Sequence, residues 1–163
     1  DLLYAPLSPA EVTIAVSLAA VTRSVMIAAI SIITFMILIE IQITNYLTLI
    51  AFTFLSSFIL GNVGIIAGLW SEKFDNMATV TNFVIVPLSF LSGTFYTIDK
   101  LPSFLQTISE FNPFFYMIDG FRYSFIGKSD GSITIGLIYL SILSVVTWFV
   151  TYLLYKKGYK IKS

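Results

Sequence analysis

Asp119 and Arg122 are the two residues of this sequence best placed to act together chemically. They stand three positions apart in a stretch that Asn112-Pro113 opens as a helix, so their side chains can meet on one face. In a partly dehydrated setting the opposite charges would neutralise each other, which costs less than burying either charge alone. Two interpretations follow: an ion pair that only staples the structure, or an ion pair at the outer gate of a transport pathway.

Other strings imitate catalytic motifs but lack the partners that the chemistry requires. Gly127-Lys128-Ser129 resembles the end of a phosphate-binding loop, but that motif needs a glycine where this chain has Arg122. The spacing of Gly127, Ser129 and Gly131 matches a nucleophile elbow, yet the chain contains no histidine to complete a triad. It also contains no cysteine to ligate a metal as a thiolate. We therefore expect a loop here, and neither a catalytic residue, nor a metal site, nor a cofactor.

The composition is typical of an integral membrane protein. The 163 residues are 57% hydrophobic and 11% charged, with a mean hydropathy of +0.91. A soluble domain carries roughly 25% charged residues, so this chain has too few to cover a water-exposed surface. Its net charge of zero says little about partners, and no nucleic-acid partner is expected. Because it starts at Asp1 and not at methionine, we expect the C-terminal part of a longer protein.

Four apolar stretches predict an all-α, polytopic membrane fold. They cover residues 12–39, 46–70, 78–95 and 133–155, against the ~20 residues that a membrane-spanning helix needs. The third stretch is marginal in length, and Pro87 removes one backbone donor and bends it. Before the first stretch, Ser8-Pro9-Ala10-Glu11 predicts a capped helix start. This start is either an ordinary cap or a surface for a partner subunit.

Polar and small residues interrupt the first two stretches. Arg23 either extends to the lipid headgroups or faces the interior of the bundle. In the second stretch, small residues at a spacing of four let another helix approach closely; they are Ser57 with Gly61, and Gly64 with Gly68. This spacing marks helix packing more often than a substrate contact. Asn62 is expected to form a hydrogen bond to another helix.

Between the third and fourth stretches, residues 101–126 predict a re-entrant helical hairpin on the extracytoplasmic side. The chain breaks at Ser92-Gly93, and two short aromatic-rich helices follow, opened by Pro102 and Pro113. Neither helix can cross a bilayer, and both are too apolar for an ordinary aqueous loop. Irregular backbone at membrane depth requires protein or a water-filled cavity around it. Pro87 and Gly93 supply conformationally soft points next to the hairpin.

The lysine distribution predicts the orientation. Four lysines follow the last apolar stretch at once: Lys156, Lys157, Lys160 and Lys162. By the positive-inside rule this C-terminal tail is cytoplasmic. With an even number of spans, residues 1–11 and the turn at 71–77 are cytoplasmic as well, and residues 40–45 and the hairpin face the other side.

A series of short motifs resembles the end of the type-2 family of ABC transporter permeases. In chain order they are Pro87-Leu-Ser-Phe-Leu-Ser-Gly93, Leu101-Pro102, Asn112-Pro113 and Tyr116-x-x-Asp119-x-x-Arg122. Ala5-Pro6-Leu7-Ser8-Pro9 is similar to the cytoplasmic segment that follows the second span in that family. The resemblance covers nearly the whole chain, and it lies in the order and spacing of motifs that are each weak alone.

The resemblance implies a six-span permease of which this chain holds the last four spans. Two such permeases pair in the plasma membrane, the inner membrane of bacteria, and each rests on a separate ABC ATPase subunit. ATP binding then drives export of a polysaccharide, a lipid-linked glycan or a hydrophobic drug. The residues implied near the ATPase contact are Pro6, Ser8 and Glu11. Those implied in the hairpin or gate are Pro87, Gly93, Pro102, Pro113, Asp119 and Arg122.

Two other classes of function remain open from the residues themselves. A secondary, ion-coupled transporter would also use a discontinuous helix such as the one around Pro87. The spans carry few ionisable groups for ion coupling, however. A membrane enzyme acting on lipids is disfavoured by the missing histidine and by carboxylates that lie mostly in loops.

Overall fold

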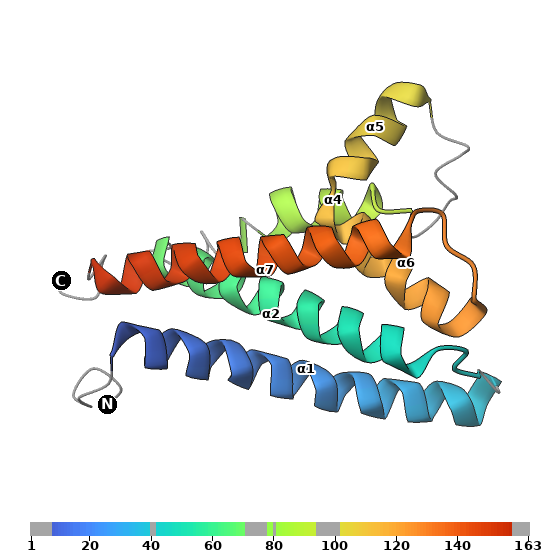
Figure 1. The fold of residues 1–163 in the computed structure, drawn as a ribbon, viewed down its shortest axis with the longest axis horizontal. Helices are drawn as coiled ribbons and strands as arrows, with labels where there is room; N and C mark the ends of the chain where they lie inside the picture. The colour runs from blue at the N-terminus through green and yellow to red at the C-terminus, as the bar shows by residue number, and fades with distance from the viewer. Residues whose placement is uncertain (1–7, 40–41, 71–77, 80, 94–101, 158–163) are drawn as a thin grey trace.

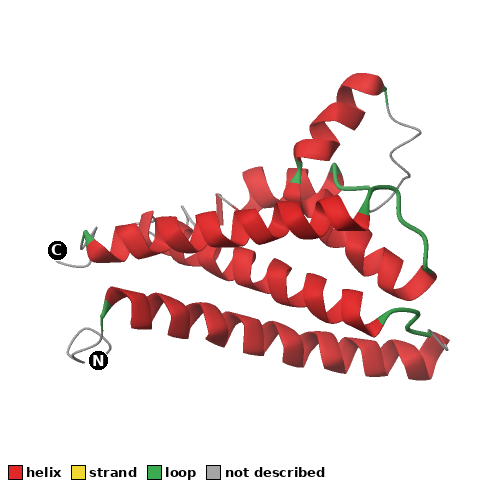
Figure 2. Ribbon diagram, viewed as in Figure 1, coloured by secondary structure: helices red, strands yellow, loops and turns green. Residues whose placement is uncertain are grey.

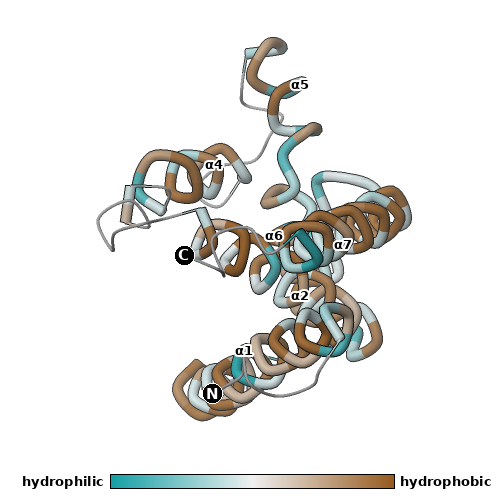
Figure 3. The backbone as a smooth tube through the Cα atoms, turned by 90° about the vertical axis from the view of Figure 1, so that its left-hand side faces the viewer, coloured by the Kyte–Doolittle hydropathy of each residue, from teal (hydrophilic) through white to brown (hydrophobic). Residues whose placement is uncertain are grey.

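The computed structural model describes residues 8–39, 42–70, 78–79, 81–93 and 102–157, and every regular element within them is helical (Figure 2). Three helices in this described part are long and apolar enough to cross a membrane: α1 (Pro9–Ile39), α2 (Tyr46–Trp70) and α7 (Ile133–Lys156). They confirm the predicted all-α membrane fold and correspond to three of the four predicted spans. Hydrophobic residues predominate along these helices (Figure 3).

Local sequence explains where these helices begin. At the start of α1, the Ser8 amide donates to Glu11 Oε2 at 2.7 Å, and the Glu11 amide donates to Ser8 Oγ at 3.3 Å. This reciprocal pair is the predicted capping box. At the start of α7, Ser132 Oγ accepts from the Ile135 amide. Each cap therefore satisfies backbone donors that the first helical turn leaves without partners.

Helix α2 lies at the centre of the bundle and packs against α1, α6 and α7. Its buried residues Phe52 and Ile59 form one cluster with Met117 of α6 and Leu140 of α7. The start of α1 and the end of α7 lie at the same end of the bundle (Figure 1). The α1–α2 turn and the end of α6 lie at the opposite end (Figure 1). The bundle thus has two distinct ends, which are called here the terminal end and the turn end.

The predicted third span at residues 78–95 is shorter and less regular in the described residues. A π-helix, η1 (Thr81–Ile85), leads directly into a short α-helix, α4 (Val86–Phe90). Together they form a 10-residue apolar segment, too short to cross a bilayer by itself. Pro87 lies at the junction and lacks the backbone donor that a regular helix needs, which accounts for the change in helix type there. Residues 80, 94 and 95 of the predicted span lie outside the described residues.

The two short helices that follow match the sequence prediction in position. Helix α5 (Ser103–Phe111) has Pro102 as its N-cap, and α6 (Pro113–Ile126) begins at Pro113. Both views place α5 away from the bundle, whereas α6 lies along α2 and α7 (Figures 1 and 3). The two helices meet at Asn112, which is called here the hairpin apex.

Candidate functional site

The hairpin apex is fastened to the end of α4 by two side chains. Asn112 Nδ2 donates to the carbonyl oxygen of Leu88 at 2.6 Å, and Ser109 Oγ donates to that of Leu91 at 3.0 Å. The last carbonyl groups of a helix have no partner within the helix. In a membrane protein such groups need a partner from elsewhere in the protein. Ser109 and Asn112 are buried and supply those partners.

Arg122 joins the turn after α4 to the loop after α6. Gly93 adopts a left-handed backbone conformation with φ of 76°, which is the region that favours glycine. Its carbonyl oxygen accepts a hydrogen bond from Arg122 Nη2 at 2.9 Å. Arg122 Nη1 lies 2.5 Å from Asp130 Oδ2 in the α6–α7 loop. One guanidinium group thus holds together two segments that are 37 residues apart in the sequence, from 93 to 130.

Asp119 organises the same loop from the buried side. Its carboxylate accepts the backbone amides of Asp130 at 2.8 Å and Gly131 at 3.0 Å. Its side chain is 3% exposed, and its distance of 4.0 Å from Arg122 Nη1 is at the limit for an ion pair. The predicted Asp119–Arg122 pair is therefore present only as a long contact. The short contact of Arg122 is with Asp130, which lies in the segment predicted only as a loop.

A polar recess of about 320 Å³ opens beside this cluster. It is lined on one side by Gln106 and Glu110 of α5 and on the other by Asp130 and Ser132. Tyr116 forms part of the wall, and its ring lies 5.1 Å from that of Tyr139. In the described residues, no group of three His, Cys, Asp or Glu side chains could hold a metal ion. The side chains that line the recess can form hydrogen bonds and aromatic contacts.

The far end of α6 is attached to the α1–α2 turn. The Thr44 and Asn45 amides both donate to the carbonyl oxygen of Ser124, at 2.8 and 3.1 Å. Thr44 Oγ1 donates to the carbonyl oxygen of Phe125 at 2.8 Å. Helix α6 is consequently held at both ends: by α4 at the apex and by the α1–α2 turn at its C-terminus.

The remaining predicted site residues lie elsewhere. Ser8 and Glu11 are at the terminal end of the bundle, remote from the hairpin, while Pro6 lies outside the described residues. Gly61 faces α1, and a Cβ atom added to it would lie 2.8 Å from Ala20 Cβ. Gly64 and Gly68 have no described atom within 4 Å of such a Cβ. The structure therefore assigns close helix packing to Gly61 and shows none at the other two.

Asn62 forms the interhelical hydrogen bond expected from the sequence. Ser17 Oγ of α1 lies 3.2 Å from Asn62 Oδ1, and both side chains are fully buried. Polar contacts of this kind strengthen helix association within a bilayer.

Sequence reasoning missed the contacts of Ser109, Asn112 and Asp130. Asn112-Pro113 indicated a helix start, which the structure confirms because Asn112 Oδ1 accepts from the Phe114 amide at 3.0 Å. The second role of Asn112, toward Leu88, depends on a contact across 24 positions that no local pattern reveals. The sequence did contain a signal for Asp130. Its carboxylate follows an apolar helix that carries Arg122, and a charge in such a setting needs a partner of opposite charge.

The profile of the ABC-2 type transporter family matches residues 1–126 of this chain, which include the hairpin and its fastening to α4. The chain belongs to the ABC-2 type transporter family. Membrane subunits of this family are non-catalytic permeases, in agreement with the absence of catalytic motifs in the sequence. The family assignment confirms the resemblance drawn from the motifs between Pro87 and Arg122.

Two curated relatives of this ABC-2 permease illustrate the match. The inner membrane transport permease YadH of Escherichia coli K12 is 33% identical over 109 residues, which are 67% of this chain and 43% of YadH. Nodulation protein J of Rhizobium leguminosarum bv. viciae is 28% identical over 90 residues, which are 55% of this chain and 35% of that protein. The match thus extends over less than half the length of each of these relatives. No solved structure matches it.

Proposed function

We propose that this chain is the C-terminal membrane part of the permease of an ATP-driven exporter. Residues 1–163 would form one transmembrane domain that pairs with a second permease copy and with a separate ABC ATPase. The observation that carries this proposal is the family match over residues 1–126. The similarity to an inner membrane transport permease supports a location in the bacterial inner membrane.

The orientation follows from the two ends of the bundle. The terminal end, with Lys156 and Lys157, would be cytoplasmic by the positive-inside rule. The turn end would face the other side of the membrane. Support comes from the hydrogen bonds of Thr44 and Asn45 to Ser124, since they attach the α1–α2 turn to the end of α6.

The segment around Pro87 would complete a fourth, irregular span, and α5 and α6 would form a re-entrant hairpin beside it. The hydrogen bonds at the hairpin apex support this arrangement, because they satisfy carbonyl groups that lipid cannot. Gly93, Pro102 and Pro113 define the bends of the hairpin. The cluster of Asp119, Arg122 and Asp130 would hold its outer end closed, as one state of an exit gate.

The substrate class would be a polysaccharide, a lipid-linked molecule or a hydrophobic drug-like compound moved out of the cytoplasm. Coupling to the ATPase would occur at the terminal end, through Pro6, Ser8 and Glu11. The capped start of α1 leads directly into a 31-residue helix, so a displacement at Ser8 would be transmitted along the whole bundle. An ion-coupled transporter is disfavoured because members of this family work with an ABC ATPase.

Disulfide or chemical crosslinking tests the coupling proposal. This chain contains no cysteine, so Ser8→Cys introduces a single reactive site into this part of the complete permease. The Ser8→Cys permease should crosslink to its ATPase, and the yield should change when ATP is added. Ser129→Cys in the α6–α7 loop is the matched control and should give no such product. Labelling of Ser8→Cys, but not Ser129→Cys, by an impermeant thiol reagent applied outside intact cells would refute the proposal.

A further inference from the structure

Arg23 is a charged residue in an otherwise apolar part of α1. It lies 14 residues after Pro9 and 16 before Ile39. At 1.5 Å per residue it is about 21 Å from one end of the helix and about 24 Å from the other. A hydrocarbon layer about 30 Å thick would therefore contain its Cα atom at depth. Charges at such depth are costly and are found where they contact a partner or a transported molecule.

No described protein group neutralises Arg23. The described residues give it neither an ion pair nor a hydrogen bond. The only acidic residue of α1 is Glu11, in its first turn, and the sequences of α2 and α7 contain none. The remaining described carboxylates belong to the hairpin and its loop: Glu110, Asp119 and Asp130. Asp119 and Asp130 are engaged with that loop and with Arg122. Within the part of the chain that the structure describes, Arg23 thus has no counter-charge.

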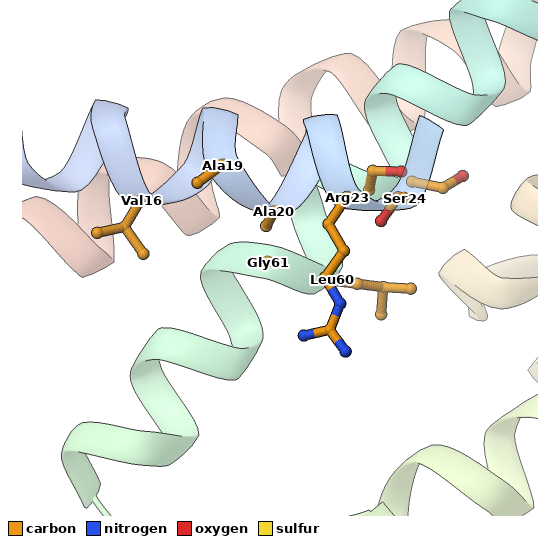
Figure 4. Close-up of a pocket in the computed structure, with 9 residues that line it drawn as sticks. Val16, Ala19, Ala20, Arg23, Ser24, Leu60 and Gly61 are labelled. Atoms are coloured by element: carbon orange, nitrogen blue, oxygen red, sulfur yellow. The ribbon is translucent and has the colours of Figure 1, made fainter. Parts of the chain in front are cut away.

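The side chain of Arg23 points into a groove between α1 and α2. Figure 4 shows it extending from α1 across the turn of α2 that carries Leu60 and Gly61. Gly61 is nine residues before Trp70, the end of α2, so the guanidinium group lies beside a point about 14 Å along the helix from that end. The exposed side chain of Arg23 therefore borders the groove at the level of Gly61.

The groove has the size and the donors to hold a headgroup. Its volume is about 540 Å³, and Ser24, Ser56 and Ser57 line it together with Arg23. It continues into a recess of about 260 Å³ that shares the three serines and reaches Phe121. Ser56 Oγ is buried and has no hydrogen-bond partner in the described residues. Among the described residues, a buried hydroxyl group without a partner and a guanidinium group without an ion pair thus line the same groove, and both can donate to an anion.

We propose that this groove binds the phosphate group of a membrane amphiphile. The guanidinium fork of Arg23 would contact two phosphate oxygens, and Ser56 would donate a further hydrogen bond. The acyl chain would lie along the exposed apolar surface of α1 beyond Ser24, where Ile27 and Ile30 are exposed. The phosphate could belong to a resident anionic phospholipid or to a lipid-linked molecule in transit.

The experiment measures lipid binding to the complete permease purified with its ATPase in detergent. Native mass spectrometry compares phosphatidylglycerol with phosphatidylcholine of the same acyl chains, without ATP. Arg23→Gln should weaken phosphatidylglycerol binding about tenfold or more, since charge-assisted hydrogen bonds are roughly twice as strong as neutral ones. Arg23→Lys, which keeps the charge but loses the fork, should give an intermediate loss. Lys128→Gln removes an exposed loop charge and is the matched control, with unchanged binding.

Two results would overturn the proposal. The first is phosphatidylglycerol binding by Arg23→Gln equal to that of the unmodified permease. The second is equal binding of phosphatidylcholine and phosphatidylglycerol. If Arg23→Gln fails to assemble, Ser56→Val serves instead, because it removes the free hydroxyl without changing charge. Unchanged phosphatidylglycerol binding by Ser56→Val would then reject the site.

A transport arm distinguishes the two sources of phosphate, and only this arm rests on the proposed export function. If the phosphate belongs to a resident lipid, Arg23→Gln should recover ATP-driven export in vesicles saturated with phosphatidylglycerol. If the phosphate belongs to a transported lipid-linked molecule, export by Arg23→Gln should stay impaired at every phosphatidylglycerol content. Failure of ATP-driven export in the unmodified permease would reject the exporter and leave the lipid-binding result standing.

Discussion

The side-chain amide nitrogen of Asn112 lies 2.6 Å from the carbonyl oxygen of Leu88, which fastens the hairpin apex to α4. The other end of the same side chain, Oδ1, caps α6 through the Phe114 amide. One residue thus starts a helix and anchors it. The two roles can be separated, because one needs a donor and the other an acceptor.

Asn112→Asp should destabilise the permease while leaving the cap of α6 in place. The carboxylate still accepts from Phe114, but it can no longer donate to Leu88 and presents a charge to that carbonyl. Leaving a buried acceptor unsatisfied costs about 1–3 kcal/mol. The measurement is the thermal unfolding of the complete permease in detergent. Thr107→Ala on the exposed face of α5 is the control and should change the midpoint little. A midpoint for Asn112→Asp as high as that of the control would show that the Leu88 contact contributes nothing.

A double-mutant cycle should give more coupling between Arg122 and Asp130 than between Arg122 and Asp119. The first pair is separated by 2.5 Å and the second by 4.0 Å. For Arg122→Gln with Asp130→Asn we expect a coupling energy of about 0.5–1 kcal/mol, near the upper range for partly exposed pairs. Unfolding of the four variants in denaturant measures it. Equal coupling in both cycles would contradict the geometry.

Arg122→Gln and Asp119→Asn test the proposed gate. Arg122→Gln should change the export rate, because it releases the turn at Gly93 from the α6–α7 loop. Asp119→Asn should do so as well, since it weakens the acceptor of the two loop amides. Transport by vesicles that contain equal amounts of assembled permease provides the comparison. If both variants export and assemble normally, the cluster has no role in the gate.

Gly61→Ala should be destabilising, whereas Gly64→Ala should be neutral or slightly stabilising. The added methyl group at 61 would lie 2.8 Å from Ala20 Cβ and force α1 and α2 apart. At 64 it would meet no described atom within 4 Å, and alanine has the better helix propensity by about 1 kcal/mol. The yield of folded permease after heating in detergent compares the two. Equal losses would mean that Gly64 packs against another subunit.

Gly120→Ala should displace α6 from α2. A Cβ atom at 120 would overlap the ring of Phe52, which is fully buried in the core. Overpacking of this kind typically costs about 1–3 kcal/mol. A second change, Phe52→Leu, makes room and should restore part of the loss when combined with Gly120→Ala. Additive losses in the double variant, measured by thermal unfolding, would exclude this contact as the cause.

Local patterns in the sequence were sufficient for much of the fold. Features that depend only on neighbouring residues appear as expected. They are the apolar lengths of α1, α2 and α7, the capping box at Ser8, and the helix starts at Pro102 and Pro113. The π-helix before Pro87 is a local effect of that proline that the apolar pattern does not show, whereas the Arg122–Asp130 contact joins residues that meet only in the folded chain. Contacts across 8 positions, as between Arg122 and Asp130, or across 24, as between Asn112 and Leu88, have no periodic signature in the sequence.

The hydrogen bonds from Thr44 to the carbonyl oxygens of Ser124 and Phe125 attach the C-terminus of α6 to the turn that follows α1. Thr44 follows α1 by five residues, so a tilt of that long helix would pull on the C-terminus of α6. Because the opposite end of α6 is anchored to α4, the pull would reach the broken helix at Pro87. In the proposed exporter, helix α6 would therefore act as a rigid link that transmits displacement of the α1–α2 turn to the segment around Pro87.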